Sequence, residues 1–160
     1  MREPSVTSQV VRFDQTERLL HWVNATLVLI LILTGSIMYI GSLSAVFGRR
    51  VLIETIHLYA GLALPVPFIA ATVGRHGGAF RRDARRLGRF LTDDWLWLRK
   101  KFRWSGRLRI GKFNAGQKLN AILVAAALPV MFVTGSMLHW HRFFPDSLRT
   151  GATFVHDWGY

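Results

Sequence analysis

The chain has 160 residues, of which 51% are hydrophobic, and it carries a formal net charge of +12. This combination is unusual for a soluble globule and typical of a membrane protein whose charges lie in its loops. The chain has no cysteine, which excludes disulfides, thiolate metal sites and cysteine-bound iron–sulfur clusters within it. Residues 1–18 contain no apolar run, so they do not form a signal peptide.

Three stretches contain no Asp, Glu, Lys or Arg: residues 19–48, 55–74 and 119–141. Each reaches the roughly 20 residues that a membrane-spanning helix needs, and we predict spans over about 19–41, 53–74 and 117–139. A fourth apolar segment begins near residue 151, and the sequence ends at Tyr160. That segment covers only about half of a hydrocarbon core. We therefore expect an all-α, integral membrane four-helix bundle whose fourth helix is cut short, in a piece of a longer protein.

The basic residues predict the orientation. The N-terminal tail and the loop over about 75–116, with Lys118 just after it, hold 17 of the 21 Lys and Arg residues. Positive charge is concentrated on the cytoplasmic side of membrane proteins, so the N-terminus and this long loop are expected in the cytoplasm. Because the chain has three spans, we interpret its basicity as a topology signal and not as nucleic-acid binding.

The long loop has an apolar pattern of its own between Arg81 and Trp104. Apolar residues recur there at steps of three or four, as expected for one face of a continuous helix: Leu87, Leu91, Trp95, Leu98 and Phe102. Arg and Lys occupy the other sides. Such a helix is predicted to lie in the lipid headgroup region, and a docking surface for a cytoplasmic partner is the alternative.

Two histidines are predicted at one depth in the membrane. His57 lies near the outer end of the second span, and His156 near the outer start of the fourth. An imidazole in a spanning helix is costly and needs a partner, a proton path or a metal. Two of them on different helices could hold a haem iron from both sides. Zinc is a weaker interpretation, because two imidazoles are too few ligands for it.

His21 is predicted at the inner end of the first span, most of a bilayer away from this pair. It therefore cannot share their iron and needs another partner. If the fourth helix continued, a residue 14 positions after His156 would lie about 21 Å deeper, at the level of His21.

The other histidines are expected to be structural. His76 falls in a turn at the inner surface, and His139 and His141 fall in an aromatic cluster at the outer interface. Residues 33–36 and 133–136 both contain Thr-Gly-Ser after an aliphatic residue. Small residues there could allow close helix packing or clear room for a flat macrocycle, and the sequence leaves both interpretations open.

The start of the third predicted span carries the most specific motif. It reads Gly111-Lys112-Phe113-Asn114-Ala115-Gly116-Gln117-Lys118, with Asn114 as the expected helix N-cap. Taken with Leu20-His21-Trp22, Ile56-His57-Leu58-Tyr59-Ala60-Gly61 and Phe154-Val155-His156, it resembles the gamma subunit of membrane-bound formate dehydrogenase. That family is a di-haem cytochrome b of four transmembrane helices. The resemblance extends from Arg12 to Tyr160, and its His-Trp pair is shared with cytochrome b subunits of hydrogenases and thiosulfate reductases.

The resemblance implies roles for individual residues. His57 and His156 match the two ligands of the outer haem b, which receives electrons from an iron–sulfur subunit. His21 matches one ligand of the inner haem b, whose second ligand in this family follows beyond the sequence given. The quinone pocket next to the inner haem is implied at three further positions: Asn114, Gly116 and Gln117. Two haems are therefore expected, one of them fully ligated within this chain.

The implied function is electron transfer across the bacterial inner membrane to menaquinone or ubiquinone. Formate oxidation is expected on a molybdenum- or tungsten-containing subunit, joined through the iron–sulfur subunit, and the family suggests a trimer of heterotrimers. One alternative is the same cytochrome serving a hydrogenase or a thiosulfate reductase-type complex. Another is a haem-free membrane anchor or small transporter, which leaves the matched depth of His57 and His156 unexplained.

Overall fold

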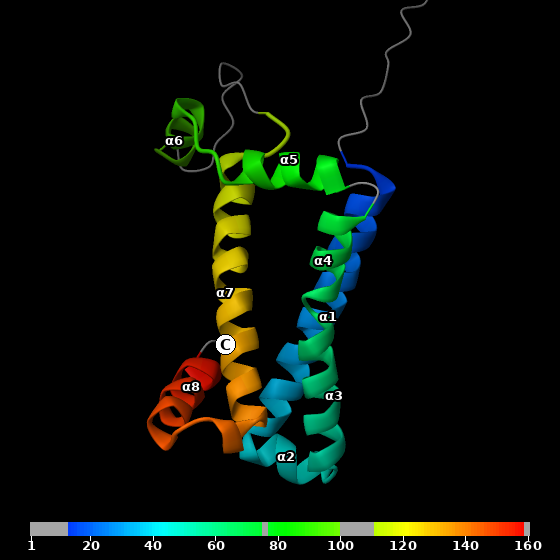
Figure 1. Ribbon diagram of the computed structural model, residues 1–160, viewed down its shortest axis with the longest axis vertical. Helices are drawn as coiled ribbons and strands as arrows, with labels where there is room; N and C mark the ends of the chain where they lie inside the picture. Colours follow the sequence, from blue (N-terminus) through cyan, green and yellow to red (C-terminus); the bar gives the residue numbers. More distant parts are fainter. Residues whose placement is uncertain (1–12, 75–76, 100–110, 159–160) are drawn as a thin grey trace, which may run out of the picture.

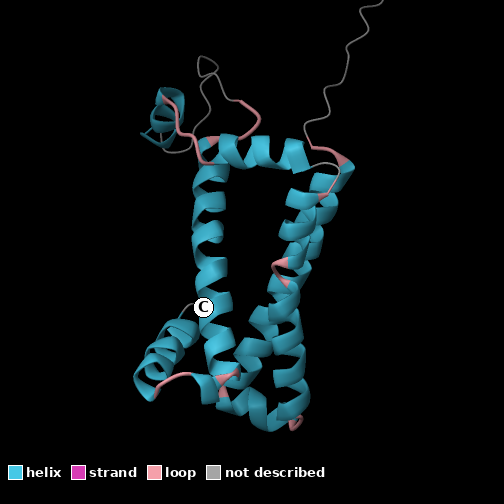
Figure 2. Cartoon of the chain, viewed as in Figure 1, coloured by secondary structure: helices cyan, strands magenta, loops and turns pink. Residues whose placement is uncertain are grey.

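The computed structural model describes residues 13–74, 77–99 and 111–158, and these residues form helices without any β-strand (Figures 1 and 2). The expectations for His76 and for Phe102 lie outside the described residues. The helices form an all-α membrane bundle, as the sequence predicted.

Two helices of equal length form the long axis of the bundle: α1 (Gln15–Tyr39) and α7 (Ala115–His139). At about 1.5 Å per residue, each is roughly 37 Å long, enough to cross a hydrocarbon core of about 30 Å. Both begin with a capping box, in which the N-cap side chain and the side chain three residues later satisfy each other's backbone amide. Asp14 and Glu17 form the box of α1, and Asn114 and Gln117 that of α7.

The second span is interrupted by a tight turn at Leu64 and Pro65. It consists of α3 (Arg50–Ala63) and α4 (Val66–Val73), which together are apolar enough to cross a membrane. A proline provides no backbone N–H for a helix interior but suits a helix start. The break therefore falls at Pro65, and α4 restarts directly after it.

The connection between the first two spans is itself helical. α2 (Gly41–Phe47) fills it, although the sequence analysis treated this segment as the end of a span and a short loop. Gly48 ends α2 with φ = 61°, a left-handed conformation that glycine adopts without steric cost.

The long helices expose their apolar side chains. In the most apolar 18-residue window of each, only 11%, 17% and 6% of the residues are buried within the protein for α1, for α3 with α4, and for α7 respectively. A water-soluble chain rarely exposes apolar surface continuously along whole helices. In a membrane protein, lipid covers it.

The continuous amphipathic helix predicted over residues 81–104 is wrong. The chain forms two shorter helices, α5 (Gly77–Leu87) and α6 (Thr92–Arg99). Gly88, a weak helix former, follows the last residue of α5. Just before α6, the backbone N–H of Leu91 donates to Asp94 Oδ2 at 2.8 Å. This local cap starts a new helix instead of continuing the old one.

Ion pairs attach these short helices to the bundle. The buried ammonium of Lys118, in the first turn of α7, lies 2.6 Å from Asp94 Oδ2 of α6 and 3.0 Å from the Arg89 carbonyl. α5 lies across the end of the bundle, from the end of α4 toward the start of α7 (Figure 1). This is the end that the sequence analysis predicts on the cytoplasmic side.

The last described helix is α8 (Asp146–Trp158), which follows a short 3-10 helix, η1 (His141–Phe143). It begins five residues before the predicted start near Gly151. α8 packs against α7, and α1 packs mainly against α3, so the bundle consists of two antiparallel helix pairs (Figure 1).

Candidate haem site

The structure brings His57 and His156 together. His57 comes from α3 and His156 from α8, which belong to different helix pairs. Their ring centroids are 6.1 Å apart, and the ring planes cross at 82°. Both side chains are partly buried.

A buried threonine contacts each of these imidazoles. Thr34 Oγ1 of α1 lies 2.8 Å from His57 Nδ1, and Thr134 Oγ1 of α7 lies 3.1 Å from His156 Nδ1. Both hydroxyls also donate to a carbonyl one turn earlier in their own helix. The Nδ1 atoms are therefore engaged with protein, and Nε2 is the nitrogen that each ring can offer to a metal.

The spacing of the rings fits an iron between them. A metal–imidazole bond is about 2 Å long, and each nitrogen lies about 1 Å from its ring centre. Two such ligands on opposite sides of one iron would place their centroids roughly 6 Å apart, close to the 6.1 Å observed. Among the described residues, no group of three or more His, Cys, Asp or Glu side chains could hold a metal ion. The arrangement therefore suits a metal whose other ligands come from a macrocycle.

A glycine makes room for His156. A Cβ atom added at Gly135 would lie 2.9 Å from His156 Cε1 and 3.5 Å from its Nδ1. Any larger residue at this position of α7 would displace the imidazole. The close neighbour of Gly135 is an imidazole ring, and both interpretations of the Thr-Gly-Ser segments stay open.

His21 is far from this pair. It lies on the second turn of α1, is exposed, and contacts the adjacent Trp22 ring edge-on at 5.5 Å. Thr34, which contacts His57, is 13 residues further along the same helix, and that corresponds to about 20 Å. His21 therefore cannot contribute to the His57–His156 site.

The three predicted quinone-pocket residues have structural contacts at the start of α7. Asn114 Oδ1 accepts from the Gln117 amide at 2.9 Å, and Gln117 Oε1 accepts from the Asn114 amide at 3.0 Å. This confirms Asn114 as the N-cap. A Cβ atom at Gly116 would lie 3.2 Å from the Trp97 ring of α6, so the glycine allows that indole to pack closely.

An ion cluster joins α1, α5 and the segment before α7. The Lys112 ammonium lies 2.6 Å from Asp83 Oδ2 and also pairs with Glu17. Burial alone would raise the pKa of Asp83. The hydrogen bonds of the cluster outweigh burial and hold this pKa below its usual range, and the bond from Lys112 has the largest lowering effect. Burial alone would lower the pKa of Lys112, but its two carboxylate partners hold it above its usual range. Asp83 and Lys112 are therefore both charged at neutral pH.

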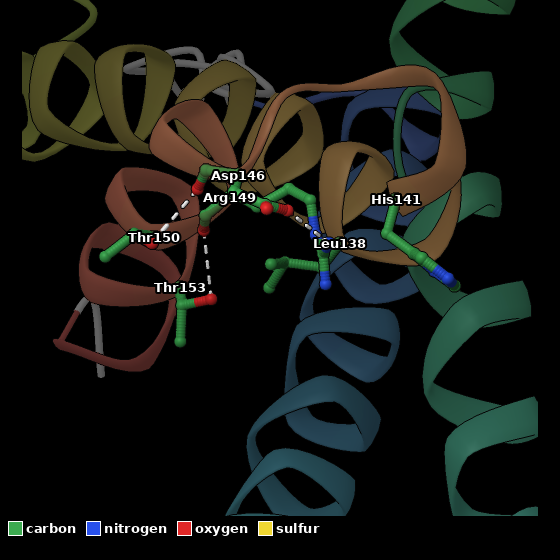
Figure 3. A pocket seen from close by; sticks show the side chains of 6 residues that line it. All are labelled: Leu138, His141, Asp146, Arg149, Thr150 and Thr153. Atoms are coloured by element: carbon green, nitrogen blue, oxygen red, sulfur yellow. Dashed lines mark hydrogen bonds and ion pairs between the residues drawn. The ribbon is translucent and has the colours of Figure 1, made fainter.

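A separate surface pocket lies between the end of α7, η1 and α8 (Figure 3). Its volume is about 330 Å³, and six side chains line it: Leu138, His141, Asp146, Arg149, Thr150 and Thr153. Arg149 pairs with Asp146 at 2.9 Å, so these two charges cancel. Neither His57 nor His156 lines this pocket, and it is therefore distinct from the candidate haem site.

The sequence analysis missed the hydrogen-bonding role of Thr34 and Thr134. A signal for it was present, because each Thr-Gly-Ser segment is followed by a histidine after a similar interval. The interval is 23 residues from Thr34 to His57 and 22 residues from Thr134 to His156. The Lys112 cluster was also missed, since its three members are far apart in the sequence.

Comparison with known proteins assigns the family. The family model described as prokaryotic cytochrome b561 matches residues 12–160. This family binds haem b, and the chain is accordingly a membrane haem b electron-transfer protein. Comparisons with curated proteins and with solved structures gave no match. With nearly its whole length matched and two imidazoles spaced for one iron, the chain belongs to the prokaryotic cytochrome b561 family.

Proposed function

We propose that this chain is the haem b membrane subunit of a formate dehydrogenase complex, carrying electrons from a periplasmic-side iron–sulfur subunit to quinone. The observation that carries the proposal is the pairing of His57 and His156 across two helix pairs. The resemblance of the segment that caps α7 to the formate dehydrogenase gamma subunit supports the choice of complex.

In this proposal, His57 and His156 hold the outer haem through Nε2. A haem with two imidazole ligands supplies a one-electron carrier with no open iron position for other chemistry. Thr34 and Thr134 orient the two rings. The surrounding helices bury the site and limit the access of water.

His21 contributes one ligand to a second haem near the inner surface. Asn114, Gly116 and Gln117 border the quinone pocket at the same end, where the backbone of α7 begins. Lys112 and its two carboxylates lie at this end too. They fix the start of α7 relative to α1 and so keep the quinone region next to His21.

The proposed setting is the bacterial inner membrane. The partners are an iron–sulfur subunit on the periplasmic side and a catalytic subunit containing molybdenum or tungsten, where formate is oxidised. The quinone is menaquinone or ubiquinone, and the complex assembles as a trimer of heterotrimers.

The first test is a dithionite-reduced minus oxidised spectrum of membranes that contain the chain. A b-type α band is expected, and it should be lost from the outer site in His57→Ala and in His156→Ala. His139→Ala and His141→Ala, which change exposed histidines outside the pair, are the matched controls and should keep the band. A haem population that survives unchanged in His57→Ala would show that the proposed ligand pairing is wrong.

The second test is the identity of the complex. Co-purification with a formate-oxidising catalytic subunit and its iron–sulfur subunit is expected. Co-purification with a hydrogenase or a thiosulfate reductase would replace the formate dehydrogenase assignment. The complete absence of Soret absorption would leave the haem-free anchor as the better description.

A further inference from the structure

The two helix pairs are related by an internal sequence repeat. Residues 13–19 read Phe-Asp-Gln-Thr-Glu-Arg-Leu, and residues 113–119 read Phe-Asn-Ala-Gly-Gln-Lys-Leu. The Thr-Gly-Ser segments follow in the same register, at 34–36 and 134–136. α1 and α7 are both 25 residues long and both begin with a capping box. The two halves therefore match in sequence, helix length and capping, and not only in their Thr-Gly-Ser segments.

Equivalent residues of the two repeats meet each other in space. Phe13 contacts its equivalent Phe113, with ring centroids 6.1 Å apart, at the inner end of the helices. His57 and His156, which close the two repeats, are also 6.1 Å apart, in the outer half. The two repeats therefore contact each other through equivalent side chains at two levels of the bundle.

The threonine contacts follow the same repeat. Thr34 is 6% exposed and Thr134 is 9% exposed, whereas the two residues before each of them in the helix are exposed. Each hydroxyl contacts Nδ1 of the histidine in its own helix pair. Each also lies near two carbonyls of its own helix, at 2.7 and 3.3 Å for Thr34 and at 2.8 and 3.2 Å for Thr134.

Counting hydrogens at these contacts determines the tautomer. A threonine hydroxyl has one hydrogen, and a carbonyl oxygen can only accept. When Thr34 donates to the Ile30 carbonyl at 2.7 Å, its oxygen must accept the hydrogen of His57 Nδ1. The same count holds for Thr134, which donates to the Val130 carbonyl at 2.8 Å and accepts from His156 Nδ1. Nδ1 therefore carries the hydrogen in both rings, and Nε2 keeps its lone pair for iron.

From this geometry we infer that Thr34 and Thr134 are a matched pair of positioning residues, which fix the tautomer of both imidazoles and lower the reduction potential of the haem between them. The inference rests on the proposed role of His57 and His156 as haem ligands. An acceptor at Nδ1 raises the basicity of the ligating nitrogen. A more basic ligand stabilises ferric iron over ferrous iron, so each hydroxyl shifts the potential downward.

The test compares Thr34→Val and Thr134→Val with wild type in the complete purified complex. Valine keeps the shape of threonine and removes the hydroxyl that contacts Nδ1. Redox titration of the outer haem should give a higher potential in each single variant and a still higher one in the double variant. Haem affinity should fall by up to about 10-fold. Thr34→Ser and Thr134→Ser should restore both properties.

Thr55→Val and Thr153→Val are the matched controls. Both hydroxyls donate to a carbonyl one turn earlier on the helices that carry the two histidines, at 2.7 and 3.0 Å, and in the described residues neither contacts an imidazole. Their potentials should equal that of wild type. A Thr55→Val shift as large as that of Thr34→Val would overturn the inference.

The outcomes separate this inference from the proposed function. If wild type binds no haem, the proposed function fails and the inference fails with it. If wild type binds haem that is lost in His57→Ala, but the potential is unchanged in both valine variants, only the inference fails. Loss of haem in a valine variant supports the inference if serine prevents the loss, and overturns it if serine does not.

Discussion

Gly135→Ala should weaken haem binding without weakening the helix that carries it. The added Cβ would lie 2.9 Å from His156 Cε1, whereas ordinary van der Waals contacts begin at 3.4 Å. The imidazole must therefore move by about 0.5 Å or more, away from α7. Its hydrogen bond to Thr134 Oγ1, now 3.1 Å long, opposes that movement. Both the position and the orientation of this ligand change.

The substitution should have opposite effects on helix stability and on haem affinity. Alanine is favoured over glycine in a helix interior by about 0.8–1 kcal/mol, so α7 gains intrinsic helix stability. Displacing a metal ligand or its supporting contacts costs about 10–100-fold in affinity, which corresponds to roughly 1.4–2.7 kcal/mol. The variant should therefore lose haem while its helical circular dichroism persists to the same or a higher temperature.

Haem titration of the purified protein, followed by Soret absorption and circular dichroism together, measures both effects. Gly61→Ala and Gly151→Ala are the matched controls. A Cβ at Gly61 would meet only Leu31 Cδ2 at 3.7 Å, and one at Gly151 would meet nothing within 4 Å. An unchanged haem affinity in Gly135→Ala would refute the argument from the geometry around His156.

The remaining predictions concern charged contacts at the two ends of the bundle. Lys112→Met should cost about 1–2 kcal/mol in thermal unfolding, less than the 3–5 kcal/mol of a fully buried pair, because this ammonium is 22% exposed. Arg50→Met, which breaks an exposed pair, should cost under about 0.5 kcal/mol. Lys118→Met leaves the Asp94 carboxylate buried without its cation and should cost about 3 kcal/mol. With pH, the contribution of Asp83, whose pKa is lowered, is complete above about pH 4 and is lost as the pH falls through the lowered value. The contribution of Lys112, whose pKa is raised, is present below about pH 10 and is lost as the pH rises through the raised value. If the melting temperature of Lys112→Met falls with decreasing pH in the same way as that of wild type, this account is contradicted.

The strongest sequence signals were those that depend on composition and local chemistry. The absence of charge over a helix length predicted the membrane helices, because lipid requires continuous apolar surface. Asn114 was identified as an N-cap from its residue type and its position before α7. The approach of His57 and His156 followed from topology, because α3 and α8 both start at the same end of the bundle and each carries its histidine.

Other features depended on contacts that no local pattern encodes. The periodic residues of the cytoplasmic loop suggested one helix, but the side chain of Asp94 caps a new helix after Gly88. The partners of Lys112 are 95 and 29 residues away in the sequence. The threonine–histidine contacts were detectable only by comparing the two halves of the chain, because a threonine inside a spanning helix is otherwise an ordinary packing residue.

The division of the candidate haem site between two helix pairs would link haem binding to assembly of the bundle. α1 packs mainly on α3 and α7 on α8, with fewer contacts between the pairs. Each pair supplies one imidazole and one threonine, so neither pair alone contains the complete site. The free energy of haem binding is therefore also free energy that joins the two pairs. Haem supply during biogenesis would then determine how much of the chain has its two helix pairs joined.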